Sequence, residues 1–359
     1  MREPFSSPAG RPHGEHSEPG PRIAIFGAGA IGCWVGGRLA AGGARVTLIG
    51  RPRVLDELSN GLTVSDLDGD RYTVRVPTTS DHGAVRDADI VLVTVKSAQT
   101  AGAGVALAKV LPKETTVVSL QNGVRNVDVL REKGITARAG MVPWNVVRRL
   151  PGAYHRGSSG VLMIEHHARD GAWYGALAAA GIAFQTRNDM VAVQWAKLVL
   201  NLNNAVNALS GLPLREELSL RGYRKVLAAA QREAIELLAQ KGQYIARLTP
   251  LPARFVPRVL DLPDSVFRIV ARPMIAIDPH ARSSMWDDLE ARRATEIEYL
   301  QGEIVTLAEA LGVPAKAAVN RALVKLVRAA ETGGRRSFTA DDLCAATGVP
   351  ATATPPAAT

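Results

Sequence analysis

The pattern of apolar and polar residues changes along the chain and divides it into two parts. Up to about residue 188, short continuous apolar runs recur between helical patterns, as is typical of buried strands in a parallel sheet. These runs lie at 22–26, 45–49, 89–96 and 115–120, with further extended segments at 136–142, 160–164 and 182–185. From about 191 to 330 the pattern is almost entirely helical. The sequence therefore predicts an α/β fold: a mostly parallel sheet with helices on both faces, followed by an all-helical C-terminal domain.

Three further segments complete the predicted organisation. Two alternating stretches, 61–65 and 71–76, flank Asp68-Gly69 and predict a hairpin. Residues 1–21 are rich in Pro, Gly, Ser and His, lack the apolar stretch of a secretory signal, and are expected to be a disordered extension. Residues 331–359 are expected to be a C-terminal tail. The two domains are thus predicted at 22–188 and 189–330, with a ligand cleft between them.

A glycine-rich motif follows the first predicted strand and opens a helix. It consists of Gly27, Ala28, Gly29, Ala30, Ile31 and Gly32. In this G-x-G-x-x-G pattern the first glycine permits the turn, the second lets a pyrophosphate approach the backbone, and the third lets helix and strand pack closely. The helix N-terminus then offers N–H groups to the phosphates. The motif predicts a dinucleotide-binding turn; the alternative is a glycine-rich turn in another α/β protein.

Arg51 stands where a fold of this kind distinguishes between dinucleotides. It follows the second predicted strand, at the place where NAD-selective folds carry Asp or Glu for the ribose 2′-OH. A guanidinium suits a 2′-phosphate instead, so Arg51 predicts NADP(H) as the cofactor. The alternative is that Arg51 and Arg53 are solvated loop charges.

The helical pattern at 195–209 carries a polar stripe on an otherwise apolar helix. Lys197, Asn201 and Asn204 share one face. Buried polar side chains need partners, which a ligand would supply. A partly desolvated lysine gives up its proton more readily, as a general acid must. The alternative is a helix held by structural asparagines, with Lys197 extending to water.

Two more side chains stand at predicted strand ends. Lys96 and Asn122 each follow a buried strand at the carboxyl edge of the sheet, where open α/β sheets bind their ligands. A lysine there can reach a phosphate or a carboxylate, and an asparagine can bond a nicotinamide amide or a substrate oxygen. Each could also be an ordinary loop residue.

A predicted helix start near residue 284 offers a further binding group. Ser284 and Asp287 form a capping-box-like S-x-x-D pattern, which can bind a substrate carboxylate. The alternative is an N-cap followed by an exposed salt-bridge ladder of Asp288, Arg292 and Glu296, which lie at successive i,i+4 steps.

Composition limits the classes of function. The chain has 359 residues, 47% of them hydrophobic, and a formal net charge of +9. The positive charge is scattered along the chain, so nucleic-acid binding is not expected. This charge either attracts anionic ligands or reflects an arginine-rich composition. No apolar run has the length of a membrane span, so no membrane partner is expected. Two isolated cysteines, Cys33 and Cys344, indicate a reducing, cytoplasmic location and no disulfide framework, and no metal site is predicted.

Taken together, the motifs resemble those of the ketopantoate reductase family (2-dehydropantoate 2-reductase). The resemblance covers about 22–330 and rests on G-A-G-A-I-G at 27–32, V-K at 95–96, Q-N-G at 121–123, K-L-x-x-N at 197–201 and S-S-M-x-x-D…T-E at 283–296. It implies a Rossmann domain, a helical C-terminal domain, and an oxidoreductase that reduces 2-dehydropantoate, a small 2-oxo acid, to (R)-pantoate with NADPH in pantothenate biosynthesis. A homodimer is a further expectation.

The resemblance also implies roles for the site residues. Lys197 is the expected general acid, because an ammonium both stabilises and neutralises the charge that hydride addition puts on the carbonyl oxygen. Glu296 is expected to order the catalytic site. The expected cofactor-binding residues are Gly27, Ala28, Gly29, Ala30, Ile31, Gly32, Arg51, Lys96, Asn122 and Glu296. The expected substrate-binding residues are Asn122, Lys197, Asn201, Asn204 and Ser284.

One position departs from the family pattern. A second substrate asparagine is expected eight residues after the lysine, and this chain has Ala205 there, with Asn204 and Asn207 as neighbours. Asn204 lies on the correct face to replace it. A reductase of another small 2-oxo acid is therefore one alternative. A dinucleotide-binding sensor without turnover is another, although a sensor needs no proton donor such as Lys197.

Overall fold

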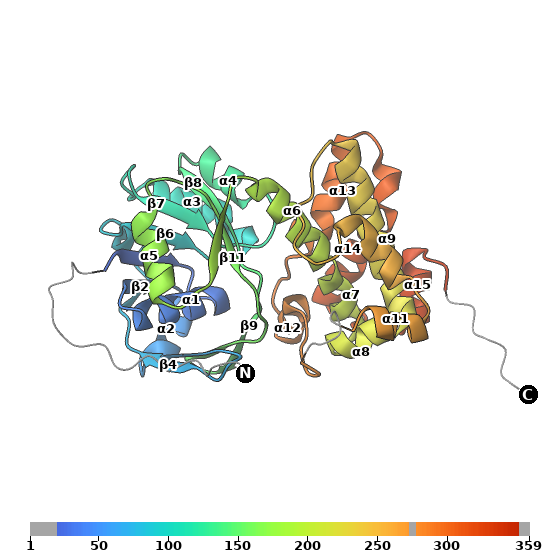
Figure 1. The fold of residues 1–359 in the computed structure, drawn as a ribbon, viewed down its shortest axis with the longest axis horizontal. Helices are drawn as coiled ribbons and strands as arrows, with labels where there is room; N and C mark the ends of the chain where they lie inside the picture. Colours follow the sequence, from blue (N-terminus) through green and yellow to red (C-terminus); the bar gives the residue numbers. More distant parts are fainter. Residues whose placement is uncertain (1–19, 273–277, 352–359) are drawn as a thin grey trace, which may run out of the picture.

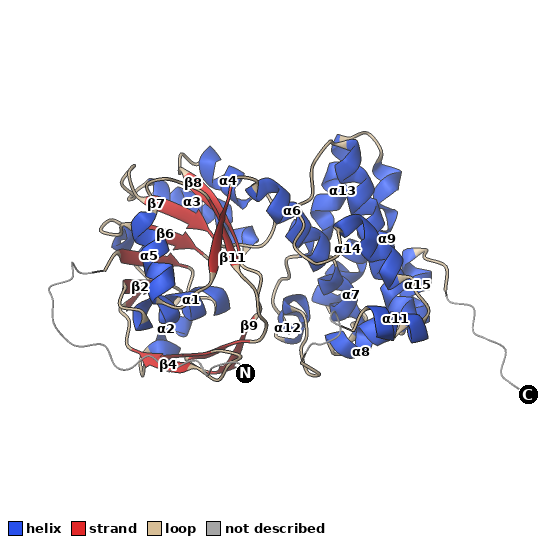
Figure 2. Cartoon of the chain, in the orientation of Figure 1, coloured by secondary structure: helices blue, strands red, loops and turns tan. Residues whose placement is uncertain are grey.

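The computed structural model describes residues 20–272 and 278–351 (Figure 1). A sheet-containing domain and a helical domain lie side by side (Figure 2). This is the α/β architecture with an all-helical second domain that the sequence predicts. Among the described residues, no helix is both long and apolar enough to cross a membrane.

The larger sheet is formed by eight strands: β1 (Arg22–Phe26), β2 (Arg45–Ile49), β5 (Thr78–Thr79), β6 (Ile90–Val93), β7 (Thr116–Ser119), β8 (Ala137–Met141), β11 (Leu162–Glu165) and β12 (Phe184–Arg187). Their order is β12-β11-β8-β7-β6-β1-β2-β5. Neighbours are parallel except for β11, which runs antiparallel to β8. Every residue of β6 is buried, as expected for a strand covered on both faces.

Helices cover both faces of this sheet. On one face, α1 (Ala30–Ala41) and α5 (Gly171–Ala179) bury Trp34 and Trp173 in an apolar cluster, and α2 (Pro52–Leu58) adds Leu58. On the other face, the apolar cluster takes Leu107 from α3 (Thr100–Ala108) and Leu130 from α4 (Asn126–Glu132). Helix α1 begins just after the carboxyl end of β1, which is a central strand of the sheet.

A second sheet of four strands packs on the outer side of α1. It consists of β3 (Leu62–Ser65), β4 (Arg71–Val74), β9 (Val146–Leu150) and β10 (Ala153–Arg156), in the order β4-β3-β10-β9. β3 and β4 are antiparallel, which confirms the predicted hairpin at Asp68-Gly69. The sequence did not indicate β9 and β10. A Cβ atom on Gly37 of α1 would lie 2.5 Å from Val64 of β3, so this glycine lets the sheet approach the helix.

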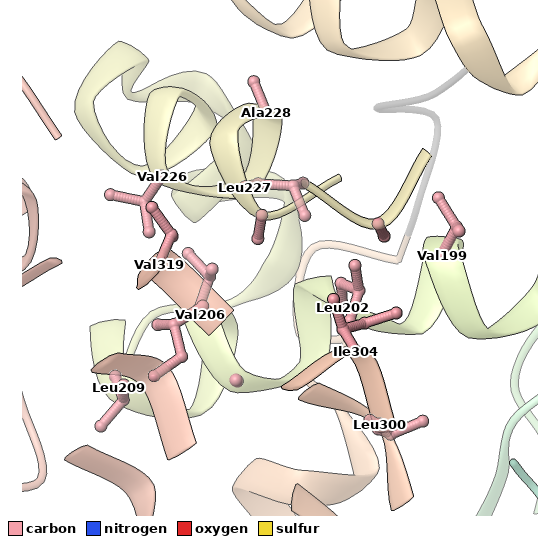
Figure 3. Packing of buried hydrophobic residues seen from close by; sticks show 14 of the residues in the cluster. Val199, Leu202, Val206, Leu209, Val226, Leu227, Ala228, Leu300, Ile304 and Val319 are labelled. Atoms are coloured by element: carbon pink, nitrogen blue, oxygen red, sulfur yellow. The ribbon is translucent and has the colours of Figure 1, made fainter. Parts of the chain in front are cut away.

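The helical domain contains α6 (Met190–Asn201), α7 (Asn203–Ser210), α8 (Leu214–Ser219), α9 (Arg221–Gln240), α10 (Val256–Leu260), α11 (Asp264–Val270), α12 (Ser284–Glu290), α13 (Gln301–Ala310), α14 (Ala318–Glu331) and α15 (Ala340–Thr347). Figure 3 shows its core, in which Val206 of α7, Val226 of α9, Ile304 of α13 and Val319 of α14 pack together. Short 3-10 helices described in the chain are η1 (His82–Val85), η2 (Ser97–Gln99), η3 (Ala253–Phe255), η4 (Ile297–Tyr299) and η5 (Pro314–Ala317).

Helix α6 joins the two domains, as Figure 1 shows. Its first half packs in the core of the sheet domain through Val193 and Ala196. Its second half packs in the core of the helical domain through Leu198 and Val199. One helix therefore belongs to both hydrophobic cores.

The predictions for the two ends of the chain, an N-terminal extension and a C-terminal tail, can be compared with the structure only in part. Residues 1–19 of the expected N-terminal extension and 352–359 lie outside the described residues. Part of the predicted tail, 331–359, is folded, because α15 packs against α9 and buries Leu343 and Cys344 completely. The hydroxyl of Tyr223 on α9 donates to the Phe338 carbonyl at 2.8 Å. The helical domain thus extends beyond residue 330, which corrects the expectation of a bare tail.

Candidate active site

A cleft of about 1360 Å³ is lined by residues of both domains. All but one of the predicted site residues line it: Gly27, Ala28, Gly29, Ala30, Ile31, Arg51, Lys96, Asn122, Lys197, Asn201, Asn204, Ser284 and Glu296. Gly32 is the exception, because it packs under the turn rather than facing the cleft. Residues that are far apart in the sequence are therefore brought to one site.

The glycine turn between β1 and α1 fits a dinucleotide pyrophosphate. Gly27 has φ +124°, which side-chain-bearing residues rarely adopt, and its carbonyl accepts from the Thr94 hydroxyl at 2.6 Å. Above Gly29 there is open space, since a Cβ built there would find no atom nearer than Thr94 O at 4.0 Å. No side chain caps α1, and its first turn holds no acidic residue. The first N–H groups of the helix are therefore available to an anion.

Arg51 lies at the side of the cleft where β2 ends. It is the N-cap residue of α2, is exposed, and lines the cleft beside Gly50. Nearby, Arg148 of β9 pairs with Glu57 at 2.8 Å. Arg51 and the glycine turn therefore line the same cleft.

Lys197 projects from α6 into the same cleft. It is half-buried, and burial lowers the pKa of its ammonium to about 8. Its Nζ donates to the Pro143 carbonyl at a long 3.4 Å. Asn201 follows one turn later, with its Nδ2 3.5 Å from Asn122 Oδ1 across the cleft. Asn204 lies beyond the joint between α6 and α7 and completes the predicted polar stripe.

Glu296 connects the two domains through hydrogen bonds. Its Oε1 accepts from the backbone N–H of Ser97 at 3.1 Å and lies 3.1 Å from the Ser97 hydroxyl. Its Oε2 accepts from Asn122 Nδ2 at 3.1 Å. The carboxylate therefore fixes the loops that follow β6 and β7. The sequence patterns did not indicate Ser97, whose only signal is that it follows Lys96 at a strand end.

Lys96 bonds to the helical domain. Its Nζ lies 2.6 Å from Asp288 Oδ2 and donates to the Ala294 carbonyl at 3.0 Å. The alternative of an exposed ladder through Asp288, Arg292 and Glu296 is wrong. Helix α12 ends at Glu290, Arg292 has φ +51°, and the Asp288 carboxylate is buried against Lys96.

The cap of α12 is one residue earlier than predicted. The Ser283 hydroxyl accepts from the Trp286 N–H at 3.2 Å, so Ser283 is the N-cap. Ser284 is consequently free of the capping role and exposed to the cleft. Trp286 and Arg282 also line the cleft, with the guanidinium 4.1 Å from the indole ring centre. The sequence analysis did not single out these last two residues.

Asn207, the other asparagine considered near Ala205, has structural partners. Asn207 is completely buried and donates from Nδ2 to the Leu212 carbonyl at 3.0 Å and to Glu217 Oε2 at 3.4 Å. Burial raises the pKa of Glu217 to about 8. Ala205 is itself fully buried and does not line the cleft. Of the two neighbours considered for the missing asparagine, only Asn204 faces the ligand space.

Comparison with known proteins identifies the family. The family model "Ketopantoate reductase PanE/ApbA" matches residues 23–169, and its C-terminal counterpart matches 189–331. The 2-dehydropantoate 2-reductase of Halobacterium salinarum is 30% identical over 87% of this chain and 100% of its own length. The chain belongs to the ketopantoate reductase family.

Solved structures agree with this membership. A ketopantoate reductase of the same family from Ralstonia eutropha JMP134 is 33% identical, with a TM-score of 0.74 over 87% of this chain and 98% of that one. D-mandelate dehydrogenase, at 21% identity, shares the fold with a TM-score of 0.72 over 87% of this chain and 98% of its own. Membership of the ketopantoate reductase family makes this protein an oxidoreductase, and a nicotinamide dinucleotide is the cofactor class that fits it. The predicted family, fold and enzyme class are confirmed.

Proposed function

We propose that this protein reduces 2-dehydropantoate to (R)-pantoate with NADPH, as a step of pantothenate biosynthesis. The observation that carries the proposal is the position of Lys197. Its ammonium, with a pKa lowered to about 8, lines the same cleft as the glycine turn. A donor whose pKa lies near the working pH is an effective general acid.

Lys197 acts on the carbonyl oxygen of the substrate. The cofactor, when bound, supplies the hydride to the carbonyl carbon. The Lys197 ammonium stabilises the negative charge that develops on the oxygen and then donates the proton that completes the alcohol. Among the described residues its one acceptor is Pro143 O at 3.4 Å, which leaves further N–H groups for the substrate.

The remaining side chains bind and orient. Asn201 and Asn204 offer amide groups along the wall next to Lys197, and the exposed Ser284 hydroxyl suits the substrate carboxylate. Asn122, held by Glu296, lies between the substrate asparagines and the cofactor side of the cleft. Glu296 therefore acts by ordering Asn122, in line with its expected role.

The preference for NADPH is assigned to Arg51. It is exposed at the end of β2, and a guanidinium can bind the 2′-phosphate in a bidentate way. The glycine turn binds the pyrophosphate, and Lys96 donates its free N–H to a group of the ligand that lies deeper in the cleft.

A reductase of another small 2-oxo acid is the second candidate. Two observations favour it: Ala205 removes a polar group, and the Arg282–Trp286 pair forms a cationic and aromatic part of the cleft wall. Arg282 and Trp286 would contact the end of the substrate that is remote from the carbonyl group.

The test is the oxidation of NADPH by the purified protein, followed by absorbance with 2-dehydropantoate and with a panel of aliphatic and aromatic 2-oxo acids. NADH is run in parallel. Rapid, NADPH-selective turnover of 2-dehydropantoate supports the first candidate. A kcat/KM at least tenfold higher for another oxo acid supports the second. NADPH binding without turnover of any oxo acid would leave the sensor alternative. A homodimer and a cytoplasmic location stay predictions, which light scattering and cell fractionation would test.

A further inference from the structure

An ion pair crosses the cleft between the two domains. Lys96 comes from the loop that follows β6 in the sheet domain, and its Nζ lies 2.6 Å from Asp288 Oδ2 on α12 of the helical domain. Asp288 is 6% exposed, whereas 40% of the Lys96 side chain is exposed, so only the carboxylate end of the pair is protected from solvent. Without Lys96, the buried Asp288 carboxylate would keep one cationic partner, Arg293, whose Nε donates to Oδ1 at 3.2 Å from within the helical domain. The contact with Lys96 is thus the one that ties this carboxylate to the sheet domain.

The ammonium of Lys96 has a limited number of donors. It carries three N–H bonds, and the helical domain takes two of them, through Asp288 and the Ala294 carbonyl at 3.0 Å. Within the part of the chain that the structure describes, one N–H is left for a ligand in the cleft, which Lys96 lines together with the glycine turn. The direction of that N–H is set by the other two contacts.

Asp288 also belongs to the helix that carries Ser284. The two residues are one turn apart on α12, so a carboxylate tied to Lys96 holds this helix against the sheet domain. On the sheet side, Lys96 directly precedes Ser97, which binds Glu296. The pair therefore connects the cofactor side of the cleft with the substrate side.

We propose that Asp288 is a positioning residue, which directs the free N–H of Lys96 at the bound ligands and couples the binding of cofactor to the binding of substrate. The inference rests on the proposed function only in taking a nicotinamide dinucleotide and an oxo acid as the ligands. Asp288 itself does not touch the reacting atoms.

The experiment compares D288N, K96M and the double variant. The dissociation constant of NADPH is measured by fluorescence, and that of 2-dehydropantoate for the complex with NADP+ by calorimetry. We expect D288N to raise the dissociation constant of the oxo acid by about tenfold or more, which is the scale of a coupling between two sites. NADPH binding without the oxo acid should change less than about threefold, because Lys96 keeps its charge. D288E should restore part of the coupling.

The double variant decides whether Asp288 acts through Lys96. If it does, K96M/D288N binds the oxo acid no more weakly than K96M, whereas independent losses would multiply. Multiplying losses would overturn the proposal, as would a D288N variant that binds the oxo acid as the wild type does.

The matched control is E303Q. Arg125 of the sheet domain donates from Nε to both carboxylate oxygens of Glu303 on α13 at 2.7 Å, and neither residue lines the cleft. E303Q thus breaks an interdomain ion pair elsewhere and should leave the coupling unchanged. An equal loss in E303Q would show that any interdomain contact has this effect and would contradict a specific role of Asp288.

Amide hydrogen exchange tests the ion pair without any substrate. In the ligand-free protein, D288N and K96M should each increase exchange at both 94–100 and 284–296, while E303Q should not. Unchanged exchange in both variants would overturn the proposal. If the wild type turned over no oxo acid, the proposed function would fail, yet exchange and NADPH binding would still report on the pair.

Discussion

Lys197 owes its low pKa, about 8, to burial rather than to a neighbouring charge. Proton donation requires the ammonium form, which is lost as the pH rises through that pKa. We therefore expect kcat/KM for oxo acid reduction to be level below about pH 8 and to fall by about tenfold per pH unit above it. Steady-state rates between about pH 6 and 10 would check this.

Replacing the lysine separates chemistry from binding. K197M should lower kcat by about 10²- to 10⁴-fold, the usual contribution of a general acid, and leave the dissociation constant of NADPH nearly unchanged. Rates and fluorescence titrations on the same preparation would test both parts. A K197M variant that kept its turnover and the alkaline fall would mean that Lys197 only extends to water and that another group donates the proton.

Arg51 has a matched control two residues away. R51D should weaken the binding of NADPH by about tenfold or more, since hydrogen bonds between charged groups contribute about 1.5–3 kcal/mol. The binding of NADH should be affected less. R53D makes the same charge change on α2 at a residue that does not line the cleft. Fluorescence titration of both variants with both dinucleotides would measure the preference. Equal effects of R51D and R53D would point to net charge rather than to a 2′-phosphate contact.

Single residues also mark where sequence reasoning stops. The S-x-x-D pattern places the cap on Ser284, whereas Ser283 caps α12. The choice is made by α7: Asn207 Oδ1 accepts from the Ser283 N–H at 2.9 Å, and the Asn204 carbonyl lies 3.2 Å from the Ser283 hydroxyl. A local rule cannot distinguish two adjacent serines when a distant helix selects between them.

At the scale of the element, α7 and α8 enclose an acid that the cleft does not use. Glu217 is fully buried, with Asn203 Nδ2 donating to it at 3.1 Å, and its pKa is raised from 4.5 to about 8. The folded state therefore holds a proton that the unfolded state releases between these values. The free energy of unfolding should fall as the pH rises from about 5 to 8.

The variant E217Q tests this directly, because glutamine keeps the shape and stays neutral. We expect E217Q to be more stable than the wild type by about 3 kcal/mol near pH 7, since the interval from pH 4.5 to pH 7 corresponds to about 1.4 kcal/mol per unit. The difference should shrink towards pH 5. Urea unfolding of both proteins at several pH values measures it, and a pH-independent difference would contradict the assignment.

Elements with strong local patterns could be predicted, and those that depend on distant partners could not. The apolar runs of β1, β6 and β7 and the Asp68-Gly69 hairpin carry their own signals. β9 has mostly exposed residues and includes Arg148 and Arg149, so it lacks a strand pattern. β10 pairs with its neighbour β9 and with β3, which lies far away in the sequence, and the pairing with β3 is what joins this hairpin to the rest of the sheet.

For the whole molecule, the last described helix completes the core of the helical domain. Ending the chain at Glu331 would remove Phe338, Leu343 and Val349 from that core. At about 1.5–3 kcal/mol for each buried apolar side chain, we expect a loss of about 5 kcal/mol and a markedly lower Tm. A chain that ends at Ala351 keeps these contacts and should unfold like the full-length protein. Thermal unfolding of both would decide, and equal Tm values would show that α15 is dispensable.

The division into two domains followed from the change of hydrophobic period near residue 188, and the cleft followed from that division. The contacts that span the cleft could not be predicted from this change of hydrophobic period. Lys96 and Asp288 belong to different patterns, and no sequence spacing relates a strand end to a helix almost two hundred positions later. Their pairing depends on how the two domains pack.

Because α6 is anchored in both hydrophobic cores, the domains cannot separate at that helix without exposing one core or the other. Any opening of the cleft must therefore be a rotation with α6 close to the axis. Lys197 lies between Ala196, in one core, and Leu198, in the other, and so it moves least in such a rotation. The proposed proton donor would thus keep its place while the cleft opens and closes around it.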